Sequence, residues 1–520
     1  MTRTLAAVDL GSNSFHLVVA RVVDGLPLVV DRLRERVVLA AGLDAQGRLE
    51  PAAEARALAC LKRFGQRLRG VAPDAVRAVG TNALRQARNG GRLLRRGQAA
   101  LGHPIEVISG QEEARLIYQG VAHELPRDGR TRLVVDIGGG STECIVGRGQ
   151  RPLRVDSLFM GCVSWTRKHF PGGRVRARDL EAAVLAAALE VEPLGQRYRR
   201  LGWQQAVGSS GTILSIEEVL REQGWSRGGI TRKGLERLRR ALLAAGNVRE
   251  LRLAGLKPER AEVLPGGLAI LLALFDGLGI ARMEVAQGAL REGLLYDMLG
   301  RLRATDPREA SVQALARRHA VEHAHAAAVE RTALALLEPC ARAWGLAGPE
   351  ARRLLGWAAR LHEVGTSLSY TGYHKHGAYL LAHSDLRGFG RLEQQRLAAL
   401  VRNHRRTLDE ATLEALPRAQ REPTLRLTAL LRLAVRLNRG RTGRATLQAR
   451  LAVRGARLAL SFPRGWLERH PLTRADLEEE AGELAAAGLR LDLRVARRAA
   501  RAPARRPARR PGQHRARARR

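Results

Sequence analysis

Three runs of apolar residues open the chain, at residues 5–10, 15–23 and 26–30, with turn residues between them. β-branched residues are frequent in these runs, so they predict three strands. Residues 51–70 carry apolar side chains at helical spacing and predict a helix. A strand, a turn and a helix are expected over residues 75–87. The next expected elements are a strand at residues 104–109 and a helix at residues 110–125.

A second cycle of this pattern starts near residue 132. Residues 132–147 repeat the apolar strand, the aspartate, the small-residue turn and the second strand, so Asp9 and Asp136 are equivalent positions. A helical stretch at residues 177–200 precedes a strand, a glycine turn and a helix at residues 205–220. Two halves with matching openings predict a duplicated α/β fold with a cleft between its lobes. The expected lobes are residues 1–125 and 126–305.

The character of the chain changes near residue 308. Strand patterns give way to long helical stretches, and a hairpin, a helix and a closing strand follow them. We therefore expect a helical domain at residues 306–440 and a small α+β domain at residues 441–496. Residues 497–520 are rich in arginine, alanine and proline, and we expect them to be disordered because they cannot bury enough apolar surface to fold.

The formal net charge of +38 attracts polyanions and speeds their capture. Residues 497–520 supply eleven arginines and no acid, so most of the excess lies in the rest of the chain. Only five of the basic residues are lysine, and this bias toward arginine is also what a GC-rich genome produces without selection. Charge alone leaves nucleic acid, a phosphate polymer and an acidic membrane surface open as partners.

Cysteine usage and hydropathy bear on the compartment. The four cysteines are far apart and form no CxxC pair, which favours buried thiols in a reducing environment. Asp9 interrupts the first apolar run, so no signal peptide is expected. The longest apolar stretch, residues 268–275, is too short to cross a bilayer. We expect a cytoplasmic protein without a transmembrane segment.

Three small-residue turns, residues 9–14, 136–142 and 208–212, each follow an apolar strand. Glycine lets backbone N–H groups approach a ligand closely, and successive N–H groups with hydroxyls form an anion nest. One such turn is commonly structural, but three facing one cleft would bind a chain of phosphates. The candidate phosphate contacts are Gly11, Ser12, Asn13, Ser14, Gly138, Gly139, Gly140, Ser141, Gly208, Ser209, Ser210, Gly211 and Thr212.

Aspartates stand at the edge of two of these turns. A carboxylate beside a phosphate site repels the ligand unless a divalent cation lies between them, and Mg²⁺ is the usual choice. Asp136 and Glu143 are the first candidates for holding Mg²⁺ or another divalent cation, and Asp9 is the next. Glu143 could equally be a solvated surface acid.

Several motifs occur in one order: "VDLGSNSFHLVV", "VGTNALRQA", "ISGQEEARLIYQGV", "VVDIGGGSTECIVG", "MGCVSW", "VGSSGT" and "VLPGGLAILLALFDGLGI". Together they resemble the exopolyphosphatase and guanosine pentaphosphate phosphohydrolase family. The resemblance is dense over residues 5–300 and looser beyond. It implies duplicated actin-like or sugar-kinase-like (ribonuclease-H-like) α/β domains with a central cleft. An all-helical domain and a small α+β cap are expected to follow.

The resemblance also implies roles for single residues. Glu113 matches the catalytic glutamate that positions and deprotonates water, and Arg85 matches an arginine that contacts substrate phosphate. Ser141 and Glu143 match phosphate-contacting and metal-side positions, and Arg260 matches a further arginine. Glu112, beside Glu113, is expected to be solvated. Arg85 could also be one more surface arginine in an arginine-rich protein.

Eight of the fourteen histidines lie between His319 and His404. Their order resembles the HD metal-phosphohydrolase domain, but His362–Glu363 stands where that domain has His–Asp. The longer acid makes a working two-metal site doubtful. We expect an HD-like accessory domain that forms dimer contacts and lines a polyanion channel, and a residual metal site is the alternative.

The leading hypothesis is a Mg²⁺-dependent exopolyphosphatase that releases orthophosphate from the end of inorganic polyphosphate, acting as a homodimer. The alternative within the family is hydrolysis of guanosine 5′-triphosphate 3′-diphosphate (pppGpp), and the sequence scarcely separates the two. A kinase or ATPase of the same superfold is disfavoured by the lack of an evident adenosine pocket. A polyanion-binding or RNA-binding protein without hydrolysis is also disfavoured, because no aromatic stacking platform occurs, so nucleic acid is expected to bind only non-specifically.

Overall fold

The computed structural model describes residues 3–495, except residues 24–25, 127, 303–305, 385, 387 and 442–448, and only the backbone at residues 301–302. The chain divides into two compact units, and each is described by itself. Unit one comprises residues 1–321 and 363–401, and unit two comprises residues 322–362 and 402–520. The arginine-rich segment 497–520 lies outside the described residues.

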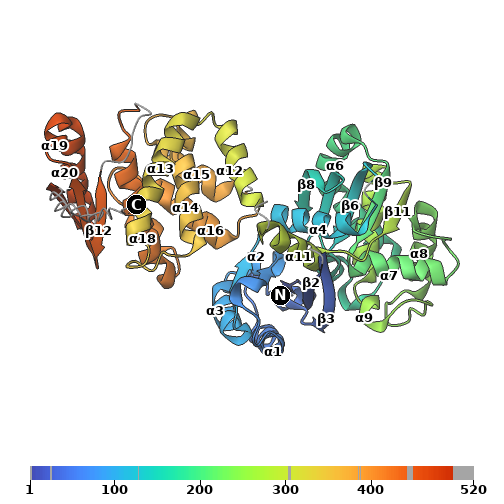
Figure 1. Cartoon of the computed structure of the whole chain (residues 1–520). Helices are drawn as coiled ribbons and strands as arrows, with labels where there is room; N and C mark the ends of the chain where they lie inside the picture. Colours follow the sequence, from blue (N-terminus) through green and yellow to red (C-terminus); the bar gives the residue numbers. More distant parts are fainter. Residues whose placement is uncertain are drawn as a thin grey trace, which may run out of the picture. The chain divides into compact units, whose positions relative to one another are not determined.

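The first lobe of unit one contains a five-stranded sheet in the order β3-β2-β1-β4-β5. Its strands are β1 (Thr4–Leu10), β2 (Ser14–Val23), β3 (Leu26–Arg36), β4 (Val76–Gly80) and β5 (Ile105–Val107). Its helices are η1 (Leu39–Gly42), α1 (Pro51–Arg67), η2 (Pro73–Ala75), α2 (Asn82–Gln86) and α3 (Gly90–Leu101). Ala57, Leu61 and Phe64 lie on one face of α1 and are buried, as the helical spacing predicts. Helices α1 and α3 lie side by side on this lobe (Figure 1).

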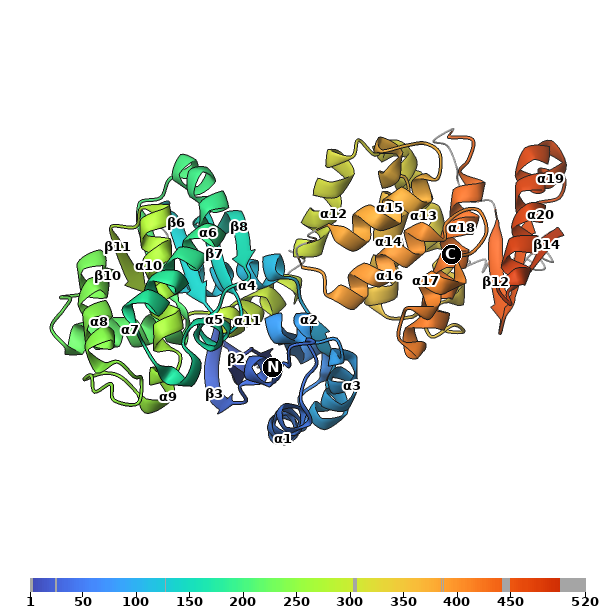
Figure 2. The ribbon, with the colours of Figure 1, turned by 180° about the vertical axis from the view of Figure 1, so that it is seen from behind.

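The second lobe contains a six-stranded sheet in the order β10-β11-β9-β6-β7-β8. Its strands are β6 (Thr131–Ile137), β7 (Thr142–Arg148), β8 (Arg151–Leu158), β9 (Gln205–Ser209), β10 (Ile230–Thr231) and β11 (Arg282–Val285). Its helices are α5 (Cys162–His169), η3 (Pro171–Gly173), α6 (Ala177–Leu201), α7 (Ser210–Glu222), α8 (Arg232–Ala245), α9 (Pro258–Ala261) and α10 (Leu264–Leu278). Helix α10 is apolar almost all round and is buried against α6 and α5 (Figure 2), as expected for a core helix.

The two lobes repeat one topology. Strand β1 pairs antiparallel with β2 and parallel with β4, and β6 pairs antiparallel with β7 and parallel with β9. In the first hairpin Asp9 faces His16 across the ladder, and in the second Asp136 faces Glu143. The predicted duplication is therefore confirmed: the protein has two α/β lobes of one strand topology, followed by helices and a small sheet.

Two helices pack across both sheets. Helices α4 (Gly110–Glu124) and α11 (Leu290–Leu302) cross where Gly293 meets the backbone of Leu116, and a Cβ at Gly293 would lie 1.9 Å from the Leu116 carbonyl oxygen. One apolar cluster joins residues of both sheets, including Val79 and Val134, to residues of α4 and α11. Packing of α11 therefore fixes the position of α4, which carries Glu113.

A buried ionic network connects α4 to β4 and α11. Asp297 accepts hydrogen bonds from Arg77 at 2.5 Å and from Arg115 at 2.6 Å. Arg115 donates to both oxygens of Glu112 at 2.7 and 2.8 Å, and the Gly388 amide donates to Glu112 at 2.8 Å. The expectation that Glu112 is solvated is wrong: its side chain is fully buried. Its partners come from distant segments, so the local sequence could not show them.

The rest of unit one is helical, and unit two combines helices with a small sheet. The further helices of unit one are α12 (Pro307–Arg318), η4 (Val364–Ser367), α15 (Tyr373–His383) and α16 (Arg391–Arg402). The last residue of α16, Arg402, belongs to unit two. Unit two has helices α13 (His323–Cys340), α14 (Pro349–Leu361), α17 (Glu410–Glu414), α18 (Arg418–Leu437), α19 (Trp466–Arg469) and α20 (Pro471–Ala486). Its sheet has the order β12-β13-β14, with β12 (Arg450–Arg454), β13 (Arg457–Phe462) and β14 (Arg490–Val495). Among the described residues, no helix is long and apolar enough to cross a bilayer.

Candidate active site

The predicted small-residue turns come together around one pocket of about 130 Å³ in unit one. Both lobes contribute to its wall. The predicted site residues that line it are Asp9, Gly11, Ser12, Asn13, Ser14, Glu113, Asp136, Gly138, Gly139, Ser141, Ser210, Gly211, Thr212 and Arg260. Loops after β1, β6 and β9 thus meet at one place, as the repeated topology requires.

The first loop follows β1 and brings several unsatisfied oxygens to the pocket. Within the described part of the chain, Asp9 Oδ1, Asn13 Oδ1 and Ser14 Oγ are buried without a hydrogen-bond partner. Ser12 Oγ accepts a hydrogen bond from the Ala83 amide at 3.2 Å, which ties the loop to α2. A buried polar atom without a partner costs free energy, so this group of oxygens indicates a site that a ligand or cation completes.

The second loop follows β6 and lies directly against the first. A Cβ at Gly139 would come within 3.1 Å of the Ser12 side chain, and one at Gly140 would lie 2.3 Å from Asn82 Nδ2. A side chain at either position would require Ser12 or Asn82 to shift, so glycine favours this close approach of the two lobes. Ser141 lines the pocket, whereas Gly140 does not. Gly140 contributes by leaving room for Asn82 beside the second loop.

The third loop follows β9 and opens α7. Ser210 has a φ of 85°, a left-handed conformation that costs energy for a residue with a side chain and is common at functional sites. The Arg260 guanidinium lies against Gly211, where a Cβ would be 2.0 Å from Arg260 Nη2. Gly208 and Ser209 belong to β9 and do not line the pocket, and Ser209 Oγ donates to the Gly288 carbonyl at 2.8 Å. These two residues support the loop.

Glu113 faces the pocket from the first turn of α4. Arg85 Nη1 lies 2.8 Å from Glu113 Oε2 and also donates to the Ile108 carbonyl at 2.9 Å. Arg85 does not line the pocket, and its side chain is 19% exposed. The alternative that Arg85 is a solvated surface residue is therefore wrong, because it contacts the predicted catalytic carboxylate directly.

Four carboxyl groups share this region of low solvent access. Burial and the nearby charge of Glu113 raise the pKa of Asp9 to about 8 and that of Asp136 to about 7. Burial and the charges of Glu113 and Asp136 also raise the pKa of Glu143. Glu143 is 1% exposed and accepts a hydrogen bond from Ser157 Oγ at 2.8 Å, so it is not a solvated surface acid. It lies behind the pocket wall.

This donor set fits a divalent cation, because a cation would offset the repulsion among the acids and satisfy Asp9 Oδ1. Among the described residues, no three of these four carboxylates have oxygens mutually within 4.8 Å. At most two of them therefore face one ion directly as the protein is folded. That arrangement matches Mg²⁺, which takes one or two carboxylates and completes its shell with water and phosphate oxygens.

The sequence patterns missed four polar residues of the pocket: His16, Thr81, Cys162 and Arg291. Arg291 Nη1 lies 3.5 Å from His16 Nδ1. Burial, together with the charges of Arg291, Arg34 and Arg260, lowers the pKa of His16 to about 3, so this ring stays neutral. His16 faces Asp9 in the first hairpin as Glu143 faces Asp136 in the second. This equivalence is the one sequence signal that could have indicated His16.

Comparison with known proteins decides the family. The sequence profile of the Ppx/GppA phosphatase family matches residues 18–302, and the profile of Ppx/GppA phosphatase domain III matches residues 308–481. The chain belongs to the Ppx/GppA phosphatase family. It is an enzyme that hydrolyses phosphoric anhydrides.

Relatives within the Ppx/GppA family carry two different names. The guanosine-5′-triphosphate,3′-diphosphate pyrophosphatase of Vibrio cholerae is 40% identical to this chain, covering 94% of this chain and 97% of that protein. The protein of the same name from Photobacterium profundum is also 40% identical, covering 92% and 95%. The crystal structure of an exopolyphosphatase from Cytophaga hutchinsonii superposes with a TM-score of 0.52 at 27% identity, covering 57% of this chain and 98% of that one.

A second hollow, of about 280 Å³, adjoins the pocket of this Ppx/GppA phosphatase and shares His16, Arg260 and Arg291 with it. Arg32 and Arg34 complete its basic wall from alternate positions of β3, where Arg34 faces His16 across the ladder. Among the described residues that line this hollow, none is acidic. Burial and the charge of Arg34 lower the pKa of Arg260, which shows that these guanidinium groups repel one another. An anion in this hollow would relieve that repulsion.

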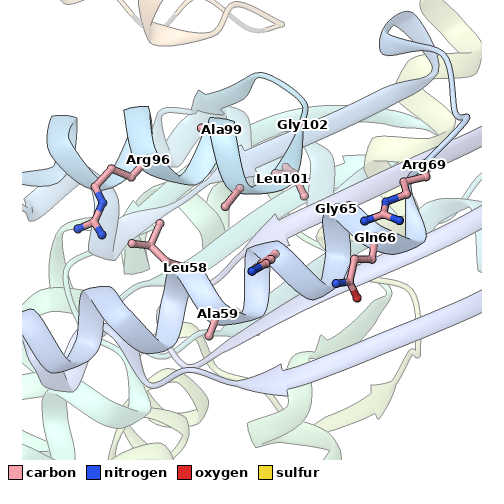
Figure 3. A pocket seen from close by; sticks show the side chains of 11 residues that line it. Leu58, Ala59, Gly65, Gln66, Arg69, Arg96, Ala99, Leu101 and Gly102 are labelled. Carbon is pink, nitrogen blue, oxygen red and sulfur yellow. The ribbon is translucent and has the colours of Figure 1, made fainter.

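A larger hollow of about 630 Å³ lies between α1 and α3 (Figure 3). Its cations, Lys62, Arg69 and Arg96, are accompanied by Gln66 and by small residues such as Gly65. Among the described residues that line it there is no carboxylate, and it shares no residue with the pocket around Glu113. It therefore lacks a group that could activate water.

Proposed function

We propose that this protein hydrolyses the terminal 5′-phosphoryl group of pppGpp, releasing orthophosphate and guanosine 5′-diphosphate 3′-diphosphate. The observation that supports it most directly is that Glu113, paired with Arg85, lines one pocket with the small-residue loops of both lobes. The relatives at 40% identity that bear the name of a pppGpp pyrophosphatase favour this substrate over the inorganic polymer.

In the proposed reaction the loop amides and hydroxyls hold the terminal phosphates, and Arg260 neutralises their charge. Glu113 orients a water molecule and takes its proton as the water oxygen bonds to the terminal phosphorus. The bond from that phosphorus to the bridging oxygen breaks, and the electron pair leaves on the diphosphate. Arg85 holds the Glu113 carboxylate in position through the 2.8 Å contact.

Asp9 and Asp136 would hold a Mg²⁺ ion or another divalent cation at the pocket, with Glu143 behind them. When bound, such an ion offsets the negative charge of the phosphate chain during transfer. The residues that line the pocket and the raised pKa values of Asp9 and Asp136 support this assignment.

The adjoining basic hollow offers a site for the 3′-diphosphate of pppGpp. Its continuity with the pocket through Arg260 and Arg291 allows one ligand to reach both. The exposed guanidinium groups of Arg32 and Arg34 would contact this second anionic arm, which inorganic polyphosphate and GTP lack.

The test compares phosphate release by the full chain, with and without Mg²⁺, from pppGpp, GTP, ATP and long polyphosphate. We expect the highest kcat/KM for pppGpp. Arg34→Ala should raise KM for pppGpp by roughly tenfold or more and leave GTP hydrolysis unchanged, since a hydrogen bond to a charged group contributes about 1.5–3 kcal/mol. Arg21→Ala, an exposed arginine on β2 outside the hollow, is the matched control.

Other outcomes would overturn the proposal in distinct ways. Faster turnover of long polyphosphate would favour exopolyphosphatase, the second candidate, which the net charge of +38 and the similarity to the Cytophaga hutchinsonii structure support. Phosphoryl transfer from ATP to an acceptor would indicate a kinase. RNA binding that survives physiological salt without phosphate release would indicate a polyanion-binding protein. If Arg34→Ala lowered kcat/KM equally for pppGpp and GTP, the basic hollow would not bind the 3′-diphosphate, and the proposed hydrolysis of pppGpp would still stand.

A further inference from the structure

Unit two contains a cluster of buried histidines that the proposed phosphate chemistry does not use. His325 lies in the first turn of α13, His362 directly follows α14, and His404 precedes α17. The three residues are 6%, 0% and 1% exposed. Histidine is buried less often than apolar residues, so three buried rings close together in one helical region are an unusual feature.

Each of two neighbouring pairs of these rings lies at the spacing of two imidazoles on one metal ion. The ring centroids of His325 and His362 are 5.5 Å apart, and those of His362 and His404 are 5.3 Å apart. Two imidazoles on one tetrahedral Zn²⁺, with Zn–N bonds of about 2.0–2.1 Å, have centroids roughly 5 Å apart. A ring nitrogen of His325 and one of His362 also lie within 4.8 Å of each other.

The hydrogen bond of His362 fixes the tautomer that a metal requires. Its Nδ1 lies 2.7 Å from the Ala359 carbonyl oxygen. A carbonyl can only accept, so Nδ1 carries the proton, and Nε2 is the nitrogen through which the ring would bind a metal. Metal-binding histidines usually donate their second N–H to a carbonyl or carboxylate in this way, which sets the ring orientation.

We infer that His325 and His362, with His404 beside them, form a binding site in unit two for one divalent transition-metal ion of the Zn²⁺ type. Imidazole nitrogens suit Zn²⁺, Fe²⁺ and Ni²⁺, whereas the carboxylates and phosphates of the active site suit Mg²⁺. The ion would hold the start of α13 to the end of α14 and stabilise unit two, separately from phosphate release.

The test uses the full chain, treated with a chelator and dialysed, then titrated with Zn²⁺ in a competition assay and with Co²⁺ as a spectroscopic probe. We expect one tight equivalent of Zn²⁺, visible d–d absorption of bound Co²⁺ and a higher melting temperature with Zn²⁺. His325→Ala and His362→Ala should each weaken binding by about 100-fold or more, because each removes a direct ligand and the loss of an outer-shell partner alone typically costs about 10–100-fold. Phosphate release from pppGpp should not change in either variant.

His323→Ala is the matched control, since His323 lies on the same helix two residues earlier and is exposed. It should bind Zn²⁺ like the unaltered protein. If His362→Ala fails to fold, as judged by circular dichroism, His325→Gln is used in its place. Glutamine removes the imidazole ligand and retains a polar side chain of similar size. The inference is overturned if the unaltered chain binds no tight equivalent of metal. It is also overturned if His323→Ala weakens binding as much as His325→Ala does.

Discussion

At the residue scale, the position of Glu113 depends on two contacts that the sequence does not reveal. Arg85 binds its carboxylate at 2.8 Å, and the neighbouring Glu112 is fully buried in a network with Arg115 and Asp297. Two adjacent acids on one helix therefore have different tasks. Glu112 anchors the helix, and Glu113 faces the pocket, so the neighbours of Glu112 determine where the proposed base lies.

Glu113→Gln should lower kcat by about 10²–10⁴, since this is the usual contribution of a positioned general base. Substrate affinity should change little, because the loops and Arg260 remain. Single-turnover phosphate release and equilibrium binding of pppGpp measure the two quantities separately. A variant that turns over normally would show that Glu113 is not the base.

Asp9→Asn should alter how stability depends on pH in the metal-free protein. The folded protein holds the Asp9 proton up to about pH 8, whereas the unfolded chain releases it near the ordinary pKa of 3.8, so the stability from this group is lost as pH rises between these values. Asparagine does not ionise, and the variant should lose less stability from pH 5 to pH 8 than the unaltered protein. Thermal unfolding in EDTA at several pH values measures this. Parallel pH profiles for both proteins would contradict the high pKa.

At the element scale, the crossing of α4 and α11 connects the fold to the chemistry. The helices approach so closely that Gly293 leaves no room for a methyl group against the Leu116 carbonyl. Asp297, on the same helix, binds Arg115 of α4 and Arg77 of β4. Helix α11 therefore fixes the orientation of α4 through both packing and charge.

Gly293→Ala should destabilise the protein by about 1–3 kcal/mol, the usual cost of overpacking, and should also lower kcat because α4 moves. Gly482→Ala is the control: Gly482 lies in α20, and a Cβ there meets nothing within 4 Å. That change should stabilise by up to about 1 kcal/mol, since alanine favours a helix. Denaturant unfolding and kcat for both variants check this. An unchanged kcat with lower stability would show that α4 is held by other contacts.

At the scale of the whole molecule, two related lobes bring their loops to one pocket. The net positive charge of the chain, which is not confined to this pocket, would attract anionic substrates to the protein. The net charge of +38 acts at long range and is screened by salt, whereas the pocket acts at contact distance. The rate of substrate capture and the rate of the chemical step should therefore be separable by experiment.

The homodimer and the domain boundaries at residues 306 and 441 remain predictions, which light scattering and expression of the separate segments would test.

Removing residues 497–520 should slow capture of anionic substrates at low salt and leave kcat unchanged, because eleven arginines are lost and no pocket residue is affected. The difference in kcat/KM should vanish at about 0.5 M salt, where the screening length falls to a few ångströms. Initial rates across a salt series measure the effect. A lower maximal rate at every salt concentration would show that the segment takes part in catalysis.

The sequence by its own patterns determined the duplicated strand–turn–strand units and the loops around Gly11, Gly139 and Gly211, and the family resemblance of one short motif predicted Glu113 as the base. These are local features, because periodicity and turn residues act over a few positions. Only the tertiary structure decided that Glu112 is buried, that Gly208 and Ser209 stand behind the pocket, and that Arg291 and His16 line it. Those facts depend on contacts between residues as far apart as Glu112 and Asp297, which the fold brings together and no local pattern encodes.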